Sequence, residues 1–215
     1  MTSEHINTQP VPEKEEHKHS LTAFPNRRWL NEHFEAIAEE NGNTLGLLFV
    51  DLDGLKDVND TDGHREGDKY ILNALEAIKD TVRHTPSDLI IHGEKDDGLP
   101  KVIHQSGDEF IVLLPGVDTE QVAQGIAKRI KETLSEVGIP LSVGTAIYSS
   151  EDDSLADLLE RAETGMRIDK EKQLFASLSP EQIERIEEIK EEIKEAGLDA
   201  LGIRALTSVL RQPHE

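Results

Sequence analysis

The sequence predicts an α/β fold: a mixed β-sheet flanked by helices, followed by a helical appendage at the C-terminus. Hydrophobic residues make up 36% of the 215 residues and gather in periodic segments, so we expect a folded core. These segments follow the order helix, strand, helix, hairpin, helix, strand, helix, which is typical of an α/β sandwich. From residue 180 a strongly charged helical pattern replaces this alternation.

For the N-terminal part of the chain, the sequence predicts a disordered tail followed by a helix. Residues 1–19 are polar and contain two prolines, so we expect them to be disordered. Asn26 is a suitable N-cap, and apolar residues follow it at helical spacing as far as about Glu40.

The most informative stretch is the apolar run expected to form a strand at residues 45–53. It ends in two carboxylates, Asp51 and Asp53. An acid at the end of a buried strand needs a partner such as a metal ion. A polar, glycine-rich segment follows, which we expect to be a loop before a helix at residues 66–83.

The next segment predicts strands around a second acidic motif. We expect strands at residues 88–92 and 101–105, separated by a turn at 95–98. The motif Ser106-Gly107-Asp108-Glu109 precedes an apolar strand at 110–114. A hairpin that carries Asp108 and Glu109 at its tip would set them beside Asp51.

The remaining elements complete the domain organisation. We expect a helix at 119–137, a strand at 140–148 in which Gly144 indicates close backbone packing, and a helix at 154–170. The expected parts are a tail at 1–19, a catalytic domain at 20–176 and a helical extension at 177–215. Within this extension we expect a helix at 180–196 with a stripe of isoleucines, followed by a short helix from Asp199. It is interpreted either as an appendage that packs on its own domain or as a dimer-forming helical hairpin.

Composition excludes several classes of partner. A formal charge of −21 argues against duplex nucleic acid and anionic membranes, which both require basic patches. The chain has no cysteine, hence no disulfide and no thiolate metal site. It has no apolar run long enough for a transmembrane helix and no apolar signal-peptide core, so we expect a cytoplasmic protein.

The acidic residues suggest phosphoryl-transfer chemistry. Three carboxylates on adjacent strand ends, Asp51, Asp53 and either Asp108 or Glu109, are what two-metal phosphoryl transfer requires. An Asp-x-Asp pair alone is a weak signal, but a second acidic pair at a hairpin tip strengthens it.

Residues 20–170 resemble the GGDEF domain of diguanylate cyclases. The motifs that carry the resemblance are LTAFPNRR (21–28), DLDGLKDVNDTDGHREGD (51–68), SGDEF (106–110) and PLSVGTAIY (140–148). The resemblance implies a polymerase-palm-like, ferredoxin-related fold. It also implies that two GTP molecules are condensed into cyclic di-GMP, each protomer of a homodimer presenting one GTP.

The resemblance implies a role for each matching position. Mg²⁺ or Mn²⁺, two per active site, would be held by Asp51, the carbonyl of Leu52 and Asp108. Asp108 would also be the general base, assisted by Glu109, while Lys56 would neutralise charge on the phosphates. The substrate-binding residues would be Asn59 and Asp68 for guanine, His64, and for the phosphates the backbone of Asp53, Gly54 and Leu55 together with Lys170.

The chain departs from the family pattern at several positions. Ser106 replaces a glycine of the signature, and His104 replaces an arginine that usually precedes it. Near the N-terminus His19 replaces an aspartate and Ala23 replaces a glycine. In the closing motif Arg167, Asp169 and Leu174 replace a tyrosine, an alanine and a phosphate-binding arginine.

These departures bear on regulation and activity. The inhibitory Arg-x-x-Asp motif expected near 97–100 is absent, and an insertion occupies 84–100, so no product inhibition of that type is expected. The predicted function is an active diguanylate cyclase. The alternative is a catalytically silent GGDEF domain that acts as a GTP-binding sensor or scaffold.

Overall fold

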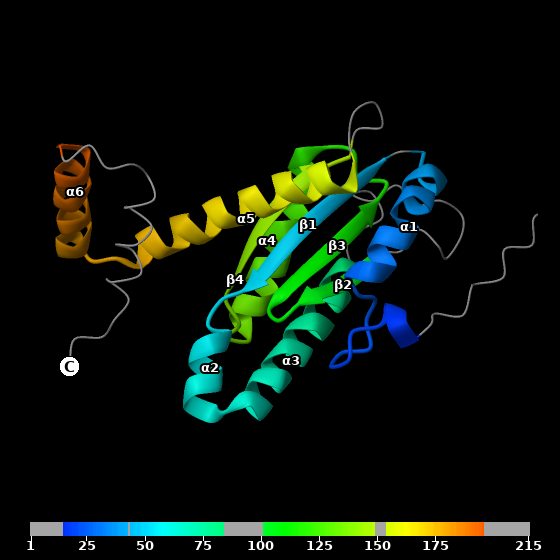
Figure 1. The fold of residues 1–215 in the computed structure, drawn as a ribbon, viewed down its shortest axis with the longest axis horizontal. Helices are drawn as coiled ribbons and strands as arrows, with labels where there is room; N and C mark the ends of the chain where they lie inside the picture. Colours follow the sequence, from blue (N-terminus) through cyan, green and yellow to red (C-terminus); the bar gives the residue numbers. More distant parts are fainter. Residues whose placement is uncertain (1–14, 43, 84–100, 149–153, 196–215) are drawn as a thin grey trace, which may run out of the picture. The chain divides into compact units, whose positions relative to one another are not determined.

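The computed structural model describes residues 15–42, 44–83, 101–148 and 154–195 (Figure 1). The chain divides into two compact units, Met1–Lys170 and Glu171–Glu215, and each is described by itself. The first unit contains the sheet and both hydrophobic clusters, and therefore every strand that positions the candidate site.

The first unit is built on a four-stranded sheet with the order β2-β3-β1-β4. The strands are β1 (Leu45–Leu52), β2 (Lys101–Ser106), β3 (Glu109–Pro115) and β4 (Leu141–Ile147). The expected palm-like α/β fold is confirmed, but the described sheet is antiparallel throughout, so the prediction of a mixed sheet was wrong. Strands β1 and β2 run in the same direction but are separated by β3, and β3 and β4 run in the same direction but are separated by β1.

The predicted helices occur in the predicted order, with one additional helix after β1 and one helix that is longer than predicted. They are α1 (Arg27–Glu40), α2 (Leu55–Asp62), α3 (His64–Arg83), α4 (Glu120–Glu136), α5 (Leu155–Ser177) and α6 (Pro180–Glu195). The segment predicted as a polar loop after β1 is helical: it forms α2 and the first turn of α3, separated by Gly63 at φ 85°. Helix α5 also continues beyond its predicted end at residue 170. The predicted cap of α1 is confirmed, because Asn26 Oδ1 accepts a hydrogen bond from the Trp29 amide at 3.0 Å.

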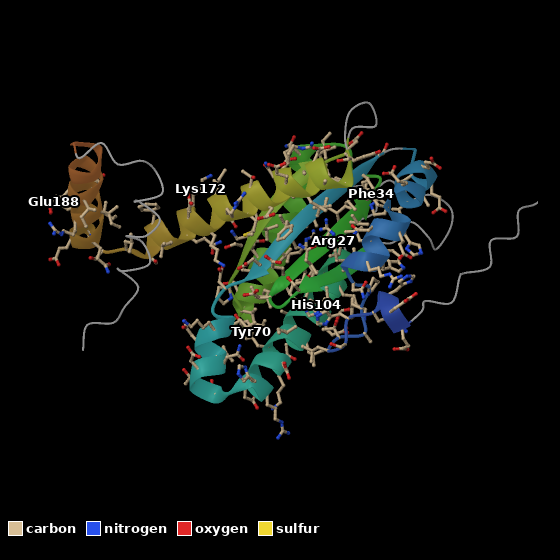
Figure 2. The ribbon with its side chains drawn as sticks, in the orientation of Figure 1. Arg27, Phe34, Tyr70, His104, Lys172 and Glu188 are labelled. Atoms are coloured by element: carbon tan, nitrogen blue, oxygen red, sulfur yellow. The ribbon has the colours of Figure 1, made fainter. Side chains whose placement is uncertain are left out.

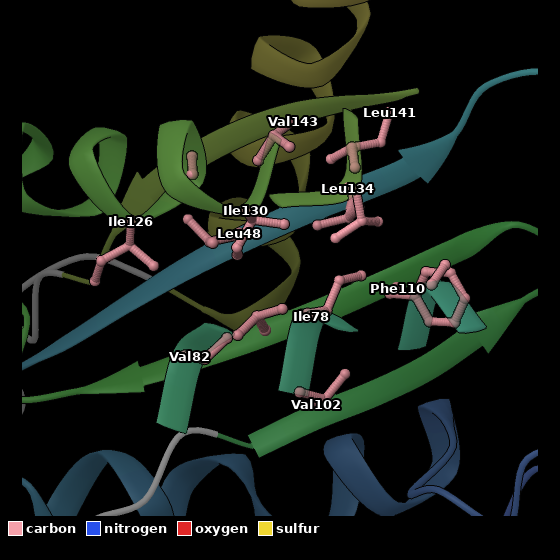
Figure 3. Packing of buried hydrophobic residues seen from close by; sticks show 14 of the residues in the cluster. Leu48, Ile78, Val82, Val102, Phe110, Ile126, Ile130, Leu134, Leu141 and Val143 are labelled. Carbon is pink, nitrogen blue, oxygen red and sulfur yellow. The ribbon is translucent and has the colours of Figure 1, made fainter. Parts of the chain in front are cut away.

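The sheet is covered on both faces by helices, as its alternating side chains require. Leu48 and Val50 of β1 belong to the cluster that includes α3 and α4 (Figure 3). Leu47 and Phe49 belong to the cluster on the opposite face, with α1 and α5. Gly144 lets α5 approach β4 closely, as predicted: a Cβ there would lie 1.8 Å from the carbonyl oxygen of Ala162.

The segment before α1 is more ordered than predicted. Residues Glu15–His17 form a 3₁₀ helix, and the His17 side chain is buried. Asn26 fixes this segment, because its side-chain amide donates to the carbonyls of Glu16 and Lys18 at 2.9 and 3.1 Å. The tail predicted to be disordered as far as residue 19 is therefore structured from Glu15 onward.

Several predictions concern residues outside the described ranges. They are the disorder of residues 1–14, the strand at 88–92, the turn at 95–98 and the helix expected from Asp199. In the second unit α6 is described, with Ile186 buried and Ile183 37% exposed. Whether this extension is an appendage or a dimerising hairpin stays a prediction. Within the described ranges, none of the helices has the length and apolar character needed to cross a bilayer.

Candidate active site

The acidic end of β1 faces helix α5. Side chains alternate along a strand, so Asp51 shares the face of Leu47 and Phe49, which pack with α1 and α5. The Asp51 side chain is 13% exposed and that of Asp53 is 23% exposed. We call Asp51 and Asp53 the acid pair.

The hairpin between β2 and β3 brings the second acidic motif to the same place, as predicted. Glu109 lies opposite Asp51 in the register of β3 and β1. The amide of Leu52 donates to the carbonyl of Asp108 at 2.9 Å. The sequence prediction that Asp108 and Glu109 lie beside Asp51 is therefore confirmed.

The conformation of the turn between β2 and β3 explains why the second signature position is still glycine, at Gly107, although the first is Ser106. Gly107 has φ 48°, a left-handed conformation that favours glycine. Ser106 is the last residue of β2, and its hydroxyl donates to Glu109 Oε2 at 2.7 Å. The replacement of the first glycine by Ser106 is therefore compatible with the turn.

A lysine from α5 completes the acid pair. The Lys170 ammonium forms ion pairs with Asp51 Oδ1 and, at 3.1 Å, with Asp53 Oδ1. Lys170 was predicted as a phosphate-binding residue. In the structure it pairs with Asp51 and Asp53, and its phosphate contact stays a prediction.

Besides Lys170, three further partners hold Asp53. The Ser142 hydroxyl donates to Asp53 Oδ2 at 2.8 Å, and the Tyr70 hydroxyl donates to the Asp53 carbonyl at 2.8 Å (Tyr70 is labelled in Figure 2). Sequence reasoning missed both roles. Ser142 stood within the motif at 140–148 without a role, and Tyr70 was not singled out.

The third partner corrects the predicted phosphate-binding backbone. The Asp53 amide donates to the Pro140 carbonyl at 2.9 Å, so it is engaged within the fold. The candidate phosphate donors that remain are the amides of Gly54 and Leu55, which precede the first intrahelical hydrogen bond of α2. Gly54 adopts φ 86° at this N-terminus.

The predicted guanine-binding residues lie on α2 and α3. Asn59 lies directly against Gly67, where a Cβ would come within 2.0 Å of Asn59 Oδ1. Asp68 is the next residue, so the α2–α3 contact brings the predicted pair into the same region. Lys56, His64 and Asp68 are exposed, and their predicted roles stay predictions.

The electrostatics show that the site is short of positive charge. Burial raises the pKa of Asp51, the pairing with Lys170 lowers it, and the charges of Asp108 and Asp53 raise it further. Burial lowers the pKa of Lys170, but its hydrogen bond to Asp51 and the charges of the acid pair outweigh burial, so the net shift is upward and the ammonium stays charged. The Lys170 ammonium pairs with two carboxylates, and the charge of a third, Asp108, acts on Asp51.

This donor set suits a hard divalent cation, because it consists of carboxylate and carbonyl oxygens with an excess of negative charge. Within the described ranges, however, no three acidic or histidine side chains are already arranged as a metal site.

His104, a departure from the family pattern, lies beneath the signature turn. Its Nε2 is 3.0 Å from the Gly107 carbonyl oxygen, and its Nδ1 is 3.1 Å from the Thr22 hydroxyl (His104 is labelled in Figure 2). The side chain is fully buried, and burial lowers its pKa to about 4. Sequence reasoning noted this substitution without assigning it a role.

Asp169, from the altered closing motif, ties α5 to its neighbours. Its carboxylate accepts hydrogen bonds from Lys131 of α4 at 2.8 and 2.9 Å and from the Val143 amide of β4 at 2.9 Å. The substitution therefore adds a structural contact beside Lys170. Arg167 is exposed and Leu174 is half-buried.

The part of the chain that carries the sheet and the candidate site matches a known family. A family model described as diguanylate cyclase, GGDEF domain, matches residues 17–174. The chain belongs to the GGDEF-domain family. This match spans all four strands of the sheet and the candidate site.

Individual relatives agree with this assignment. The GGDEF domain is 32% identical to the diguanylate cyclase TpbB of Pseudomonas aeruginosa over 166 residues, which cover 72% of this chain and 35% of the relative. It is 30% identical to the diguanylate cyclase DosC of Escherichia coli over 145 residues, or 62% of this chain and 28% of the relative. The chain thus spans about a third of the length of these curated relatives. A solved structure of the GGDEF domain of TpbB from Pseudomonas aeruginosa is 30% identical, with a TM-score of 0.58, and the alignment covers 73% of this chain and 90% of that one.

Proposed function

We propose that this GGDEF domain is an active diguanylate cyclase, which condenses two GTP molecules into cyclic di-GMP. The observation that carries the proposal is the junction of β1 with the signature turn, where Leu52 donates to the Asp108 carbonyl and Glu109 lies opposite Asp51. This junction supplies carboxylates beside a helix N-terminus and beside the predicted guanine-binding residues. These are the groups that metal-dependent nucleotidyl transfer needs.

Asp51, the carbonyl of Leu52 and Asp108 would hold the divalent cations, Mg²⁺ or Mn²⁺, two per active site. When bound, they supply charge neutralisation and orientation at the reacting phosphate. The first-turn amides of α2, at Gly54 and Leu55, would receive the β- and γ-phosphates, since a helix N-terminus binds anions.

Asp108 would accept the proton of a ribose 3′-hydroxyl. The 3′-oxygen then forms a bond to the α-phosphorus of the second GTP, while the bond to pyrophosphate breaks. Glu109 and Lys56 would support this step by positioning and by charge neutralisation. Repetition with the roles of the two nucleotides exchanged closes the ring.

Asn59 and Asp68 would select guanine, because an amide and a carboxylate satisfy its acceptor and donor groups. His64, at the start of α3, lies on the same helix as Asp68. Since one site holds one GTP, the reaction needs a second copy of this chain that faces the first.

The decisive experiment is incubation of the purified full chain with GTP and Mg²⁺, with the product identified by mass spectrometry. We expect cyclic di-GMP and pyrophosphate, and an Asp108→Asn variant that folds normally and makes neither. Wild-type protein that yields no cyclic di-GMP at high concentration would contradict the proposal.

The second candidate is a catalytically silent GTP-binding domain. It is favoured by Leu174, which stands where the family has a phosphate-binding arginine. Loss of one charged phosphate contact costs about 1.5–3 kcal/mol. Tight GTP binding in calorimetry without product would select this candidate, whereas product formation excludes it.

A further inference from the structure

Lys170 forms an ion pair with Asp51, which is also one of the proposed ligands of the divalent cation. The ammonium contacts Asp51 and Asp53 together, and both carboxylates are largely buried. A cation held by two carboxylates lowers their affinity for a second cation, because the two positive charges repel each other at contact distance.

The placement of Lys170 is enforced by the docking of α5. One turn earlier, α5 contacts β4 backbone to backbone, where a Cβ on Gly144 would lie 2.2 Å from the Met166 amide nitrogen. The adjacent Asp169 accepts from Lys131 and from the Val143 amide. A helix fixed at both points directs the next side chain to one place, and that place is the acid pair.

Lys170 nevertheless does not neutralise all the negative charge of the site. Lys170 pairs with the acid pair, and Asp108 lies near enough to Asp51 to affect its charge, so two negative charges remain if all three carboxylates are ionised. A divalent cation would neutralise this remainder, and Asp51 would then have to turn from Lys170 toward it. The lysine and the cation therefore compete for oxygens that neither neutralises alone.

We propose that Lys170 is an exchangeable counter-ion of the acid pair, and that Asp169 is the residue that positions it. Without nucleotide, Lys170 holds Asp51 and Asp53 and keeps their affinity for free divalent cations low. When a cation binds with a nucleotide, Lys170 leaves the acid pair, and its ammonium becomes available to the triphosphate. The proposal rests on the proposed function, and it adds that cation and nucleotide bind cooperatively.

The test measures Mn²⁺ binding to the full-length, nucleotide-free protein by electron paramagnetic resonance, in which free Mn²⁺ gives the signal. Lys170→Met removes the charge and keeps the length of the side chain. We expect it to bind Mn²⁺ about tenfold more tightly than the wild type, as expected for removal of one competing charge at contact distance. Lys170→Arg keeps a cation at this position and should bind as weakly as the wild type.

A matched control separates this effect from net charge. Lys128 lies on α4 with its side chain 77% exposed, so Lys128→Met changes the charge of the protein equally and should leave Mn²⁺ affinity unchanged. Asp169→Asn should raise Mn²⁺ affinity by a smaller factor, because it loosens Lys170. A merely structural defect would lower the affinity or leave it unchanged.

The proposal is overturned if Lys170→Met binds Mn²⁺ no more tightly than the wild type, including the case in which neither binds. It is also overturned if Lys128→Met gains affinity to the same extent. Since no turnover is measured, absence of cyclase activity would leave this result intact, and the two proposals can fail separately.

Discussion

The imidazole ring of His104 stacks on the ring of His19, with 3.6 Å between the ring centroids. These two histidines are both departures from the family pattern, 85 residues apart in the sequence and in direct contact in the fold. A carbonyl oxygen can only accept, so Nε2 of His104 carries the proton that it donates to Gly107. Nδ1 then accepts from the Thr22 hydroxyl. A neutral His104 therefore links the N-terminal segment to the signature turn.

The stability of the domain should decrease in acid because of His104. The pKa of His104 is lowered to about 4 by burial, from 6.5 in an unfolded chain. As the pH falls below 6.5, the unfolded state binds a proton that the folded state excludes. The neutral His104 contributes fully to the free energy of unfolding above pH 6.5. This contribution, on the order of 3 kcal/mol, is lost as the pH falls toward 4.

Urea denaturation at pH 7, 6, 5 and 4 measures this loss. His104→Gln retains a donor for Gly107 but cannot titrate, so its stability should fall less over this range than that of the wild type. His64→Gln, at an exposed histidine, should keep the wild-type slope. Parallel curves for His104→Gln and the wild type would refute the assignment.

Ala23→Gly should stabilise the protein. Ala23 is the only non-glycine residue with positive φ in the described ranges, at 57°, and it stands where the family has glycine. A left-handed conformation costs an alanine about 1–2 kcal/mol, part of which glycine loses again through its more flexible unfolded state. We expect a gain of about 0.5–1 kcal/mol in the free energy of unfolding. Ala36→Gly, at an exposed position in the middle of α1, should instead lose about 1 kcal/mol, and a loss at both positions would contradict the prediction.

Gly67→Ala should weaken GTP binding. Its new Cβ would meet Asn59 Oδ1 at 2.0 Å and force that side chain out of place. Because Asn59 is a proposed guanine-binding residue, we expect the Kd for GTP to rise about tenfold, equivalent to one hydrogen bond. The discrimination between GTP and ATP in calorimetry should fall with it.

Gly125→Ala is the matched control. It changes a helical glycine with nothing within 4 Å of the new Cβ, so it should leave GTP affinity unchanged and leave stability equal or slightly higher. Equal GTP affinity in the wild type and in Gly67→Ala would show that Asn59 does not depend on this contact.

A chain that ends at Ser177 should remain folded. Both hydrophobic clusters and Lys170 belong to residues before this point. We expect a Tm within a few degrees of that of the full chain, since neither hydrophobic cluster loses a side chain. Sedimentation of the same protein distinguishes the two interpretations of the extension: reduced dimer content supports the dimerising hairpin, and unchanged dimer content supports the appendage.

The sequence by itself determined the elements and the chemistry of the site. Periodicity located the strands and most helices, and the acids of β1 and the signature turn were placed together correctly, because each follows or precedes an apolar strand. The segment after β1 was predicted as a loop because its polar composition hides α2, whose described residues are all at least partly exposed. Whether neighbouring strands are parallel or antiparallel depends on the order of the strands in the sheet. That order is a property of the whole fold, so local sequence patterns did not reveal that the sheet is antiparallel.

Only the tertiary structure decided how the altered residues act. His19 and His104 were two separate substitutions in the sequence, and the fold makes them one stacked pair. Asp169 was noted only as a departure from the closing motif. In the fold its carboxylate accepts hydrogen bonds from Lys131 of α4 and from the Val143 amide of β4. Lys170 was matched to phosphate from its position in a motif, and it binds Asp51, 119 residues earlier, because α5 packs on the face of the sheet to which Asp51 points. Side chains distant in sequence meet only when the sheet and its helices are assembled, so no pattern along the chain could reveal these partners.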